Sequence, residues 1–139
     1  MDLRLTKTIL LDDLVALYDA VGWHAYTQDP KRLVEAVRRS TYVVSIWEDN
    51  QLVGLARGLS DDVSIFYLQD VLVHPDWQGR GWGRRMVENC LQRFAHVRQK
   101  VLLTDNEDRQ RQFYTALGFH EIADTPLTAF VCLETEATE

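Results

Sequence analysis

Long apolar runs are missing from this chain. No uninterrupted apolar stretch reaches the roughly eighteen residues that a membrane-spanning helix needs. The first residues also lack the basic and then apolar layout of a secretory signal peptide. These absences argue against membrane and secreted proteins, and we expect a cytoplasmic protein with no membrane partner.

Cysteine is scarce as well, with two residues in 139. Cys90 and Cys132 stand far apart, without the spacing of a metal site. Cys90 falls in a helical pattern and Cys132 in an expected terminal strand, so both are interpreted as reduced core thiols. His96 and His120 are expected at surface or edge positions, and no metal site is predicted.

Positive charge is in the minority. The chain has 15 Lys and Arg against 21 Asp and Glu, a net charge of −6, so no nucleic-acid partner is expected. The basic residues are concentrated: residues 78–112 hold eight of them with four acids, and the remaining residues hold seven with seventeen acids. A basic segment on an acidic chain suits an anionic cofactor, and the acidic remainder could attract a cationic amine.

No internal repeat, low-complexity segment or linker divides the sequence. With 46% hydrophobic residues, the chain is large enough for one core, and we expect a single domain over residues 1–139. Periodicity predicts a strand, two helices, three strands, a helix, a strand, a helix and two strands. The expected strands are 3–7, 42–47, 52–58, 65–73, 101–104, 119–123 and 128–133. The expected helices are 12–18, 30–40 with Asp29 as its N-cap, 81–94 and 107–117, and residues 22–30 are expected as a loop.

Three of the seven glycines, Gly79, Gly81 and Gly83, fall within five residues. An apolar run precedes them and a helix-like pattern follows, so a strand is expected to turn sharply into a helix. The first N–H groups of such a helix lack intrahelical partners, and the helix dipole adds about half a positive charge. Because glycine lets an anion approach the backbone closely, this turn is predicted to bind a phosphate group.

The glycine run lacks the residues of other phosphate-binding loops. No Gly-Lys-Ser/Thr triplet follows, and the glycine spacing differs from the dinucleotide-binding fingerprint. The chain therefore lacks the motifs expected of an unrelated nucleotide-binding protein. What remains is Gln78-x-x-Gly81-x-Gly83, preceded by the residues Val-His-Pro at 73–75. This pattern resembles the acyl-CoA pyrophosphate motif of the GNAT family of N-acetyltransferases. The alternative is an ordinary glycine-rich turn.

A second stretch, Phe113 to Phe119, resembles the other hallmark of the same family. It reads as a helix that ends at Gly118, a favourable C′ residue. In the family the helix tyrosine, here Tyr114, lies near the thioester sulfur. The two motifs occur in the family's order, and the resemblance covers the chain from about Tyr42 onward.

This resemblance implies an α/β fold with a mixed, mostly antiparallel central sheet flanked by helices. It also implies acetyl-CoA as the cofactor and direct attack of a primary amine on the thioester. A small-molecule amine is the expected acceptor partner. Dimerisation is common in the family, so a homodimer stays open.

The resemblance also assigns the cofactor contacts. The backbone of Val71, Leu72 and Val73 is expected to bind pantetheine and the acetyl carbonyl. The residues expected around the pyrophosphate are Gln78, Gly79, Arg80, Gly81, Gly83 and Arg84. Many family members carry an asparagine seven residues before the helix tyrosine, where this chain has Glu107. Asn106, one residue earlier, is expected either to contact the cofactor or to cap the helix with Asp105.

Amine acetylation needs a neutral nucleophile and benefits from a proton donor to the departing thiolate. The resemblance makes Tyr114 the candidate general acid, and a half-buried structural tyrosine is the alternative. Asp70 is the ionisable candidate for the general base. Strict alternation points it away from the acceptor unless a bulge intervenes. A water relay, or uptake of the neutral amine, stands beside it.

The acceptor is expected opposite the cofactor, beside Tyr67 and Gln69 and the loop between the first two helices. In that loop, Trp23 and Tyr26 are expected either to hold a cationic amine by cation–π contact or to anchor the loop on the sheet. Two other functions stay open: acetylation of protein N-termini or lysines, and acyl-CoA binding without catalysis. Because one fold supports many activities, the fold does not identify the amine.

Overall fold

A computed structural model of the chain describes residues 1–134 in two compact units, the first Met1–Leu103 and the second beginning at Thr104. The first unit comprises β1 (Asp2–Arg4), α1 (Leu11–Ala20), α2 (His24–Thr27), α3 (Pro30–Arg38), β2 (Tyr42–Glu48), β3 (Gln51–Ser60), β4 (Ile65–Val73), the 3₁₀ turn η1 (Pro75–Trp77), α4 (Trp82–Arg93) and β5 (Gln99–Leu102). The second comprises α5 (Asp108–Ala116) and the 3₁₀ turn η2 (Ile122–Asp124). The expectation of one domain over the whole chain stays a prediction.

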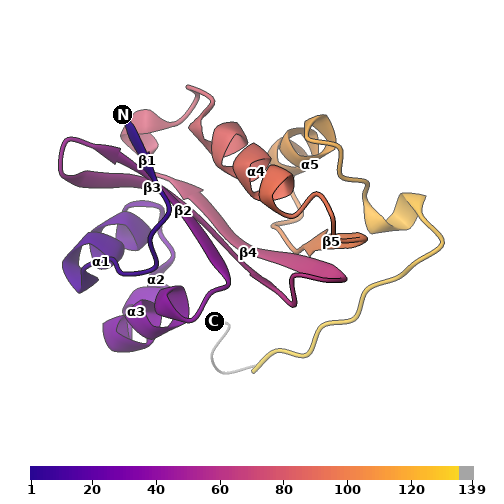
Figure 1. Ribbon diagram of the computed structural model, residues 1–139, viewed down its shortest axis with the longest axis horizontal. Coiled ribbons are helices and arrows are strands. Elements are labelled where there is room, and N and C mark those ends of the chain that lie inside the picture. Colours follow the sequence, from indigo (N-terminus) through magenta and orange to yellow (C-terminus); the bar gives the residue numbers. More distant parts are fainter. Residues whose placement is uncertain (135–139) are drawn as a thin grey trace. The chain divides into compact units, whose positions relative to one another are not determined.

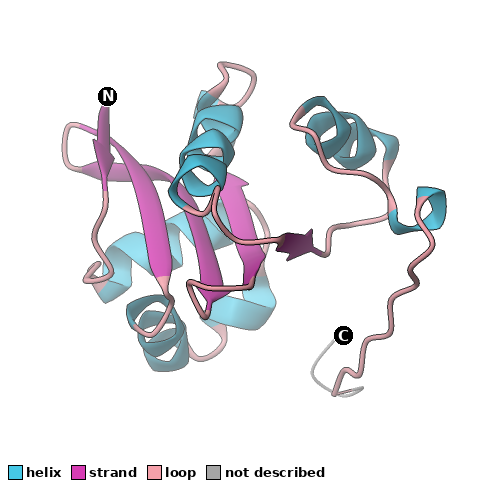
Figure 2. Cartoon of the chain, turned by 45° about the vertical axis from the view of Figure 1, so that its right-hand side comes forward, coloured by secondary structure: helices cyan, strands magenta, loops and turns pink. Residues whose placement is uncertain are grey.

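The first unit is built on a five-stranded sheet in the order β1-β2-β3-β4-β5. Neighbouring strands from β1 to β4 are antiparallel, and β5 runs parallel to β4. In Figure 1 the helices α1, α2 and α3 cover one face of the sheet and α4 covers the other; Figure 2 shows the same layers from another side. The predicted mixed, mostly antiparallel sheet flanked by helices is confirmed.

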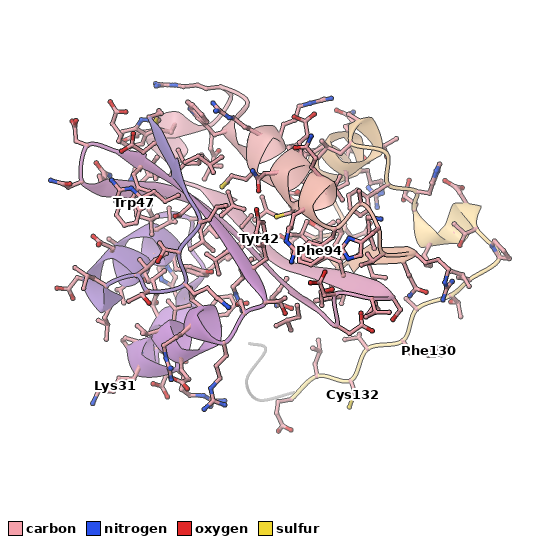
Figure 3. The ribbon with its side chains drawn as sticks, viewed as in Figure 1. Lys31, Tyr42, Trp47, Phe94, Phe130 and Cys132 are labelled. Carbon is pink, nitrogen blue, oxygen red and sulfur yellow. The ribbon has the colours of Figure 1, made fainter. Side chains whose placement is uncertain are left out.

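Each face of the sheet has its own apolar core. On the first face, buried side chains of α1 and α3 pack with strand residues; they include Leu14, Leu17, Tyr18, Leu33, Val37, Val43, Leu55 and Leu72. On the second face, α4 contributes the buried residues Met86, Val87 and Cys90, and Phe94 follows it. Tyr42 and Phe94 meet edge to face with ring centroids 5.5 Å apart (Figure 3). Burial raises the pKa of the Cys90 thiol to about 12, which makes it an inert core residue.

Most predicted elements are present, with bounds that differ by a few residues. β4 has the predicted bounds, 65–73. Asp29 caps α3, because its carboxylate accepts a hydrogen bond from the Arg32 N–H at 3.3 Å. Gly118 has φ +97° directly after the last turn of α5, which confirms it as the C′ residue. The predicted loop 22–30 differs, since it contains the single-turn helix α2.

The two closing strands predicted at 119–123 and 128–133 are wrong. The first segment forms the 3₁₀ turn η2, in which Asp124 N–H donates to the Glu121 carbonyl at 3.0 Å. Residues 127–134 belong to no helix or strand, and Phe130 is 94% exposed (Figure 3). Cys132 is therefore exposed and not a core thiol. An apolar alternating pattern indicates a propensity for strand, whereas a strand also needs a partner that local sequence does not specify.

The packing of β3 predicts unequal effects at two glycines. A Cβ at Gly58 would overlap the ring of Phe66, whereas a Cβ at Gly54 would lie 3.2 Å from the flexible end of Met86. We expect Gly58→Ala to lower the free energy of unfolding by about 1–3 kcal/mol. Gly54→Ala, the matched control, should cost clearly less. Urea denaturation measures both, and equal losses would contradict this packing.

Candidate active site

A β-bulge in β4 lies at the centre of the site. Arg57 of β3 pairs with Asp70, and the next residue, Gly58, pairs with Leu68. Gln69 is therefore an extra residue in β4 without a partner in β3. A bulge of this kind reverses the face to which the following side chains point.

The packing on either side of the bulge confirms this reversal. Before it, Phe66 stacks on Phe94 at the end of α4, with ring centroids 4.4 Å apart. After it, Leu72 belongs to the core formed with α1 and α3. Asp70 faces the same helices, since it accepts a hydrogen bond from Tyr18 of α1. Strict alternation therefore does not hold for Asp70, because a bulge intervenes, whereas a catalytic role for this residue stays a prediction.

Asp70 and Arg57 form a buried ion pair that connects the sheet to three helical elements. The two residues are 4% and 6% exposed, and the Arg57 Nε donates to Asp70 Oδ2 at 2.6 Å. The same oxygen accepts from the Tyr18 hydroxyl at 3.0 Å, and Asp70 Oδ1 accepts from the Tyr26 hydroxyl at 2.8 Å. Arg57 Nη1 donates to Ser40 Oγ, just beyond α3, at 3.3 Å. Helices α1 and α2 and the end of α3 therefore share one charged centre.

The Tyr26 hydroxyl uses every hydrogen-bonding position that it has. It donates to Asp70 and accepts from Arg57 Nη2 at 3.3 Å and from Gln69 Nε2 at 3.2 Å. Burial, together with the negative charge of Asp70, raises the pKa of Tyr26, and the same two causes raise the pKa of Tyr18 well above its usual value. Both phenols consequently remain hydrogen-bond donors through neutral pH. The ring of Tyr26, rather than its hydroxyl, is the part left to meet a ligand.

The charge of Arg57 is stabilised in spite of its burial. Burial alone would lower the pKa of the guanidinium, but the charge of Asp70 and its hydrogen bond outweigh this and raise it. Arg57 therefore stays protonated beside Asp70.

The predicted acceptor residues gather at this centre. Trp23 and Tyr26 are partly buried against the apolar core, and Tyr26 meets Tyr18 edge to face with centroids 5.0 Å apart. Gln69 contacts the Tyr26 hydroxyl. Burial, together with the nearby negative charge of Asp70, raises the pKa of Tyr67. These contacts support anchoring of the 22–28 segment on the sheet.

The glycine run forms a sharp turn between η1 and α4. Gly79 and Gly81 have φ of +77° and +85°, a left-handed conformation that side-chain-bearing residues rarely adopt. A Cβ built at either glycine would meet nothing within 4 Å, so the space beside the backbone is open. Intrahelical bonding begins with Arg85 N–H donating to the Gly81 carbonyl, which leaves the earlier N–H groups of α4 at the positive end of the helix dipole.

Two of the three arginines near this turn contact other side chains of α4. Arg84 Nε donates to Glu88 one turn along α4 at 3.0 Å, and the Arg85 guanidinium lies 5.3 Å from the Trp82 ring centroid. Arg80 is exposed next to the two left-handed glycines. These three side chains place positive charge along the start of α4.

The edge of β4 opposite β3 is paired over only part of its length. β5 pairs with Ile65–Leu68, so its pairs end where the bulge begins. His74 N–H donates to the Val53 carbonyl of β3 at 2.8 Å, and backbone groups alternate in direction along an antiparallel ladder. Val71 and Val73 therefore turn their backbone groups to the edge beyond β5. Leu72 turns its own toward β3, unlike the expectation that all three residues bind cofactor.

The Gln78 side chain braces this edge at its end. Its Nε2 donates to the Val73 carbonyl at 2.9 Å. Gln78, the first residue of the glycine motif, thus connects the glycine turn to the end of β4. The backbone groups of Val71 and the Val73 N–H remain directed outward.

Tyr114 and Asn106 belong to the second unit. Tyr114 is partly buried in α5, where its ring meets those of Phe113 and Phe119 edge to face at 4.9 and 5.8 Å. The N-cap of α5 is Glu107, without a side-chain cap, so the interpretation of Asn106 and Asp105 as caps is wrong. Cofactor contact by Asn106 stays a prediction.

Comparison with known proteins decides the family. The model of the acetyltransferase (GNAT) domain matches residues 39–121. This chain belongs to the GNAT family of acetyltransferases. The match includes β2, the bulged strand, the glycine turn and α5, so both predicted motifs lie within it.

Individual relatives of this GNAT domain agree with the assignment. An uncharacterized N-acetyltransferase, ycf52, from Porphyra purpurea is 31% identical over 118 residues, which cover 82% of this chain and 67% of the relative. The chain spans about two thirds of the length of three ycf52 relatives and about half of the length of other curated relatives it matches.

Solved structures share the fold. A GNAT acetyltransferase from Streptococcus pneumoniae TIGR4 superimposes with a TM-score of 0.82 at 25% identity, covering 96% of this chain and 97% of that one. The aminoglycoside N-acetyltransferase AAC(6′)-Iy, solved in complex with CoA, gives 0.71 at 17% identity, covering 95% and 93%.

Two features are not found in the part of this GNAT domain that the structure describes: a metal-binding cluster and a membrane-spanning helix. Within residues 1–134 no group of three His, Cys, Asp or Glu side chains is placed to hold a metal ion. Among the same residues, no helix has the length and apolar character to cross a bilayer.

Sequence reasoning missed Arg57 and Tyr18. Arg57 had a usable signal, because a single charged residue in the otherwise apolar run 52–58 favours a buried ion pair. Tyr18 had no such signal, since a tyrosine in an amphipathic helix is usually core. Its hydroxyl finds Asp70 only after α1 packs on the sheet.

The raised pKa values of Tyr18 and Tyr26 predict a loss of stability at alkaline pH. Above pH 10.0, the usual pKa, the unfolded chain releases phenolic protons that the folded chain still holds. The folded state then binds more protons, so the free energy of unfolding falls as pH rises. Tyr26→Phe should make this fall shallower. Urea denaturation between about pH 8 and pH 11 tests it, and parallel curves would contradict the burial of the Tyr26 hydroxyl.

Proposed function

We propose that this GNAT domain transfers the acetyl group of acetyl-CoA to the neutral nitrogen of a primary amine, in a small molecule. The observation that supports this most directly lies on one stretch of chain. The outward-facing backbone of Val71 and Val73 leads, within ten residues, into the left-handed glycines at the start of α4. A thioester and a pyrophosphate require such neighbouring sites.

The residues at the turn fit a pyrophosphate. Open space beside Gly79 and Gly81 lets an anion reach the first N–H groups of α4, where the helix dipole favours negative charge. Arg80 and Arg84 add positive charge at the same end. Gln78 holds the turn against β4 through the Val73 carbonyl.

Acetyl-CoA, when bound, supplies a thioester whose C–S bond breaks as the amine nitrogen forms a C–N bond to the carbonyl carbon. The outward N–H groups of Val71 and Val73 are suited to receive the carbonyl oxygen as it gains negative charge. Tyr114 acts as general acid and donates its phenolic proton to the departing sulfur, because a phenol is neutral at pH 7. The amine must arrive neutral to offer its lone pair, and the proton that its nitrogen loses after attack passes to water, from which Tyr114 is reprotonated.

The acceptor binds beside the bulge, on the side where Tyr67, Gln69 and the segment that carries Trp23 and Tyr26 lie. All four side chains are partly exposed. The rings of Trp23, Tyr26 and Tyr67 offer faces to a cation, and the Tyr26 hydroxyl is already bound to Asp70 and Gln69.

The cofactor prediction is tested by calorimetric titration of the wild-type protein with acetyl-CoA, CoA and NADH. We expect binding of both CoA compounds and none of NADH. Gly81→Glu should abolish binding, because its carboxylate would stand where the pyrophosphate is expected. Gly81→Ala is the matched control: it has the same left-handed backbone strain but no charge, and should retain more affinity. Absence of CoA binding by the wild type would contradict the proposal.

The role of Tyr114 is tested by Tyr114→Phe in steady-state assays of thiol release with an amine that the wild type acetylates. Loss of a general acid should lower kcat about a hundredfold and leave the KM for acetyl-CoA nearly unchanged. Tyr42→Phe is the matched control, since its hydroxyl donates to Asn89 at 2.6 Å under α4. Equal kcat values in the two variants would make Tyr114 a packing residue.

A further inference from the structure

The Arg57–Asp70 pair has a property that packing alone does not explain. Arg57 and Asp70 are the charged side chains among the buried residues of the part that is described, and they lie beside a largely apolar core. Removing charges from water is costly, and apolar side chains of similar size often stabilise a fold equally well. The effect to expect from such a pair is therefore on geometry rather than on stability.

The element whose position depends most on these contacts is α2. It is a single turn, His24–Thr27, with no fully buried residue, and isolated helices of this length are unstable in water. Two kinds of tie hold it. On its outer side the Asp19 carboxylate accepts a hydrogen bond from the Thr27 hydroxyl and contacts the His24 ring, and both contacts are exposed to solvent. On its inner side the Tyr26 hydroxyl binds Asp70, Arg57 and Gln69.

The inner tie depends on both ions. Asp70 Oδ1 accepts a hydrogen bond from the Tyr26 hydroxyl, and Arg57 Nη2 donates one to the same hydroxyl. Replacing either ion therefore removes one partner of the Tyr26 hydroxyl. Because Gln69 is the bulge residue and donates to this hydroxyl as well, the ring is also tied to the strand that carries the predicted acceptor residues.

We propose that the buried Arg57–Asp70 pair is a positioning device that fixes residues 21–28 on β4 through the Tyr26 hydroxyl and thereby sets the affinity for the acceptor amine. The pair does not touch the reacting atoms. This proposal rests on the function proposed above for the acceptor side of the bulge.

The same contacts argue against Asp70 as the general base. Three donors already bind its carboxylate: Arg57, Tyr18 and Tyr26. A proton taken up by Asp70 would leave the buried guanidinium without its counter-ion, which is strongly unfavourable. The amine is instead used in its neutral form or loses its proton to water.

Three variants of the full chain separate positioning from basicity. Arg57→Met/Asp70→Leu removes both ions together and leaves an apolar pair that should fold. Arg57→Met/Asp70→Asn also removes both charges and leaves no unpaired guanidinium; it keeps an oxygen that can accept from Tyr26 but lacks a basic carboxylate. Arg93→Met/Asp62→Asn is the matched control, because it removes an exposed pair, 3.0 Å apart, between α4 and the loop before β4.

Two measurements are made on each variant. Hydrogen exchange of the amides at 21–28 reports the segment without any substrate. Steady-state kinetics with spermidine, tyramine and sisomicin as acceptors separates the acceptor KM from kcat and from the KM for acetyl-CoA.

We expect the double variant Arg57→Met/Asp70→Leu to exchange faster at 21–28 and to raise the acceptor KM about tenfold, with the KM for acetyl-CoA unchanged. Arg57→Met/Asp70→Asn should keep the shape of the pH profile of kcat/KM, and the control should match the wild type. Unchanged exchange in Arg57→Met/Asp70→Leu overturns the proposal, and so does loss of the acidic limb of the profile in Arg57→Met/Asp70→Asn. Failure of the wild type to acetylate any of the three amines would count against the proposed function, while the exchange rates would still decide whether the pair holds the segment.

Discussion

The extra residue in β4 is the constraint on which the first unit depends. Side chains alternate along a strand, so a regular β4 would present Phe66, Leu68, Asp70 and Leu72 to one face. Both cores need residues from this strand: Phe66 stacks under α4, and Leu72 packs under α1 and α3. Gln69, unpaired with β3, lets one strand serve both faces. The bulge lies where the pairing of β4 with β5 ends, so the strand that changes face is also the strand with an outward-facing backbone edge.

Charge is distributed around this strand in two distinct ways. At the glycine turn, positive charge comes from exposed arginines and from the start of α4, and it meets solvent. At the bulge, Arg57 and Asp70 are buried and neutralise each other. The first arrangement is suited to bind an anion. The second binds the hydroxyls of tyrosines from α1 and α2, and partly exposed aromatic rings lie beside it, where the acceptor is predicted.

Local sequence predicted the features that local physics produces. The bounds of β4, the Asp29 cap and the Gly118 terminus each depend on a few neighbouring residues and were predicted correctly. The glycine turn was also predicted, because left-handed backbone next to a helix start has a strong sequence signal. The two C-terminal strands failed for the converse reason. A strand is completed by a partner, and a short apolar alternating run does not say which partner, if any, it meets.

The sequence by itself determined the family and the position of the glycine turn, since both are encoded by closely spaced glycines and one aromatic helix motif. Tertiary structure alone decided which side chains meet at the bulge. Asp70, Arg57, Tyr18 and Tyr26 are as much as 52 positions apart, and they meet only when the bulge turns Asp70 toward α1 and α2. The register of one strand pair sets that direction, and register depends on how both cores fill, which no local pattern records.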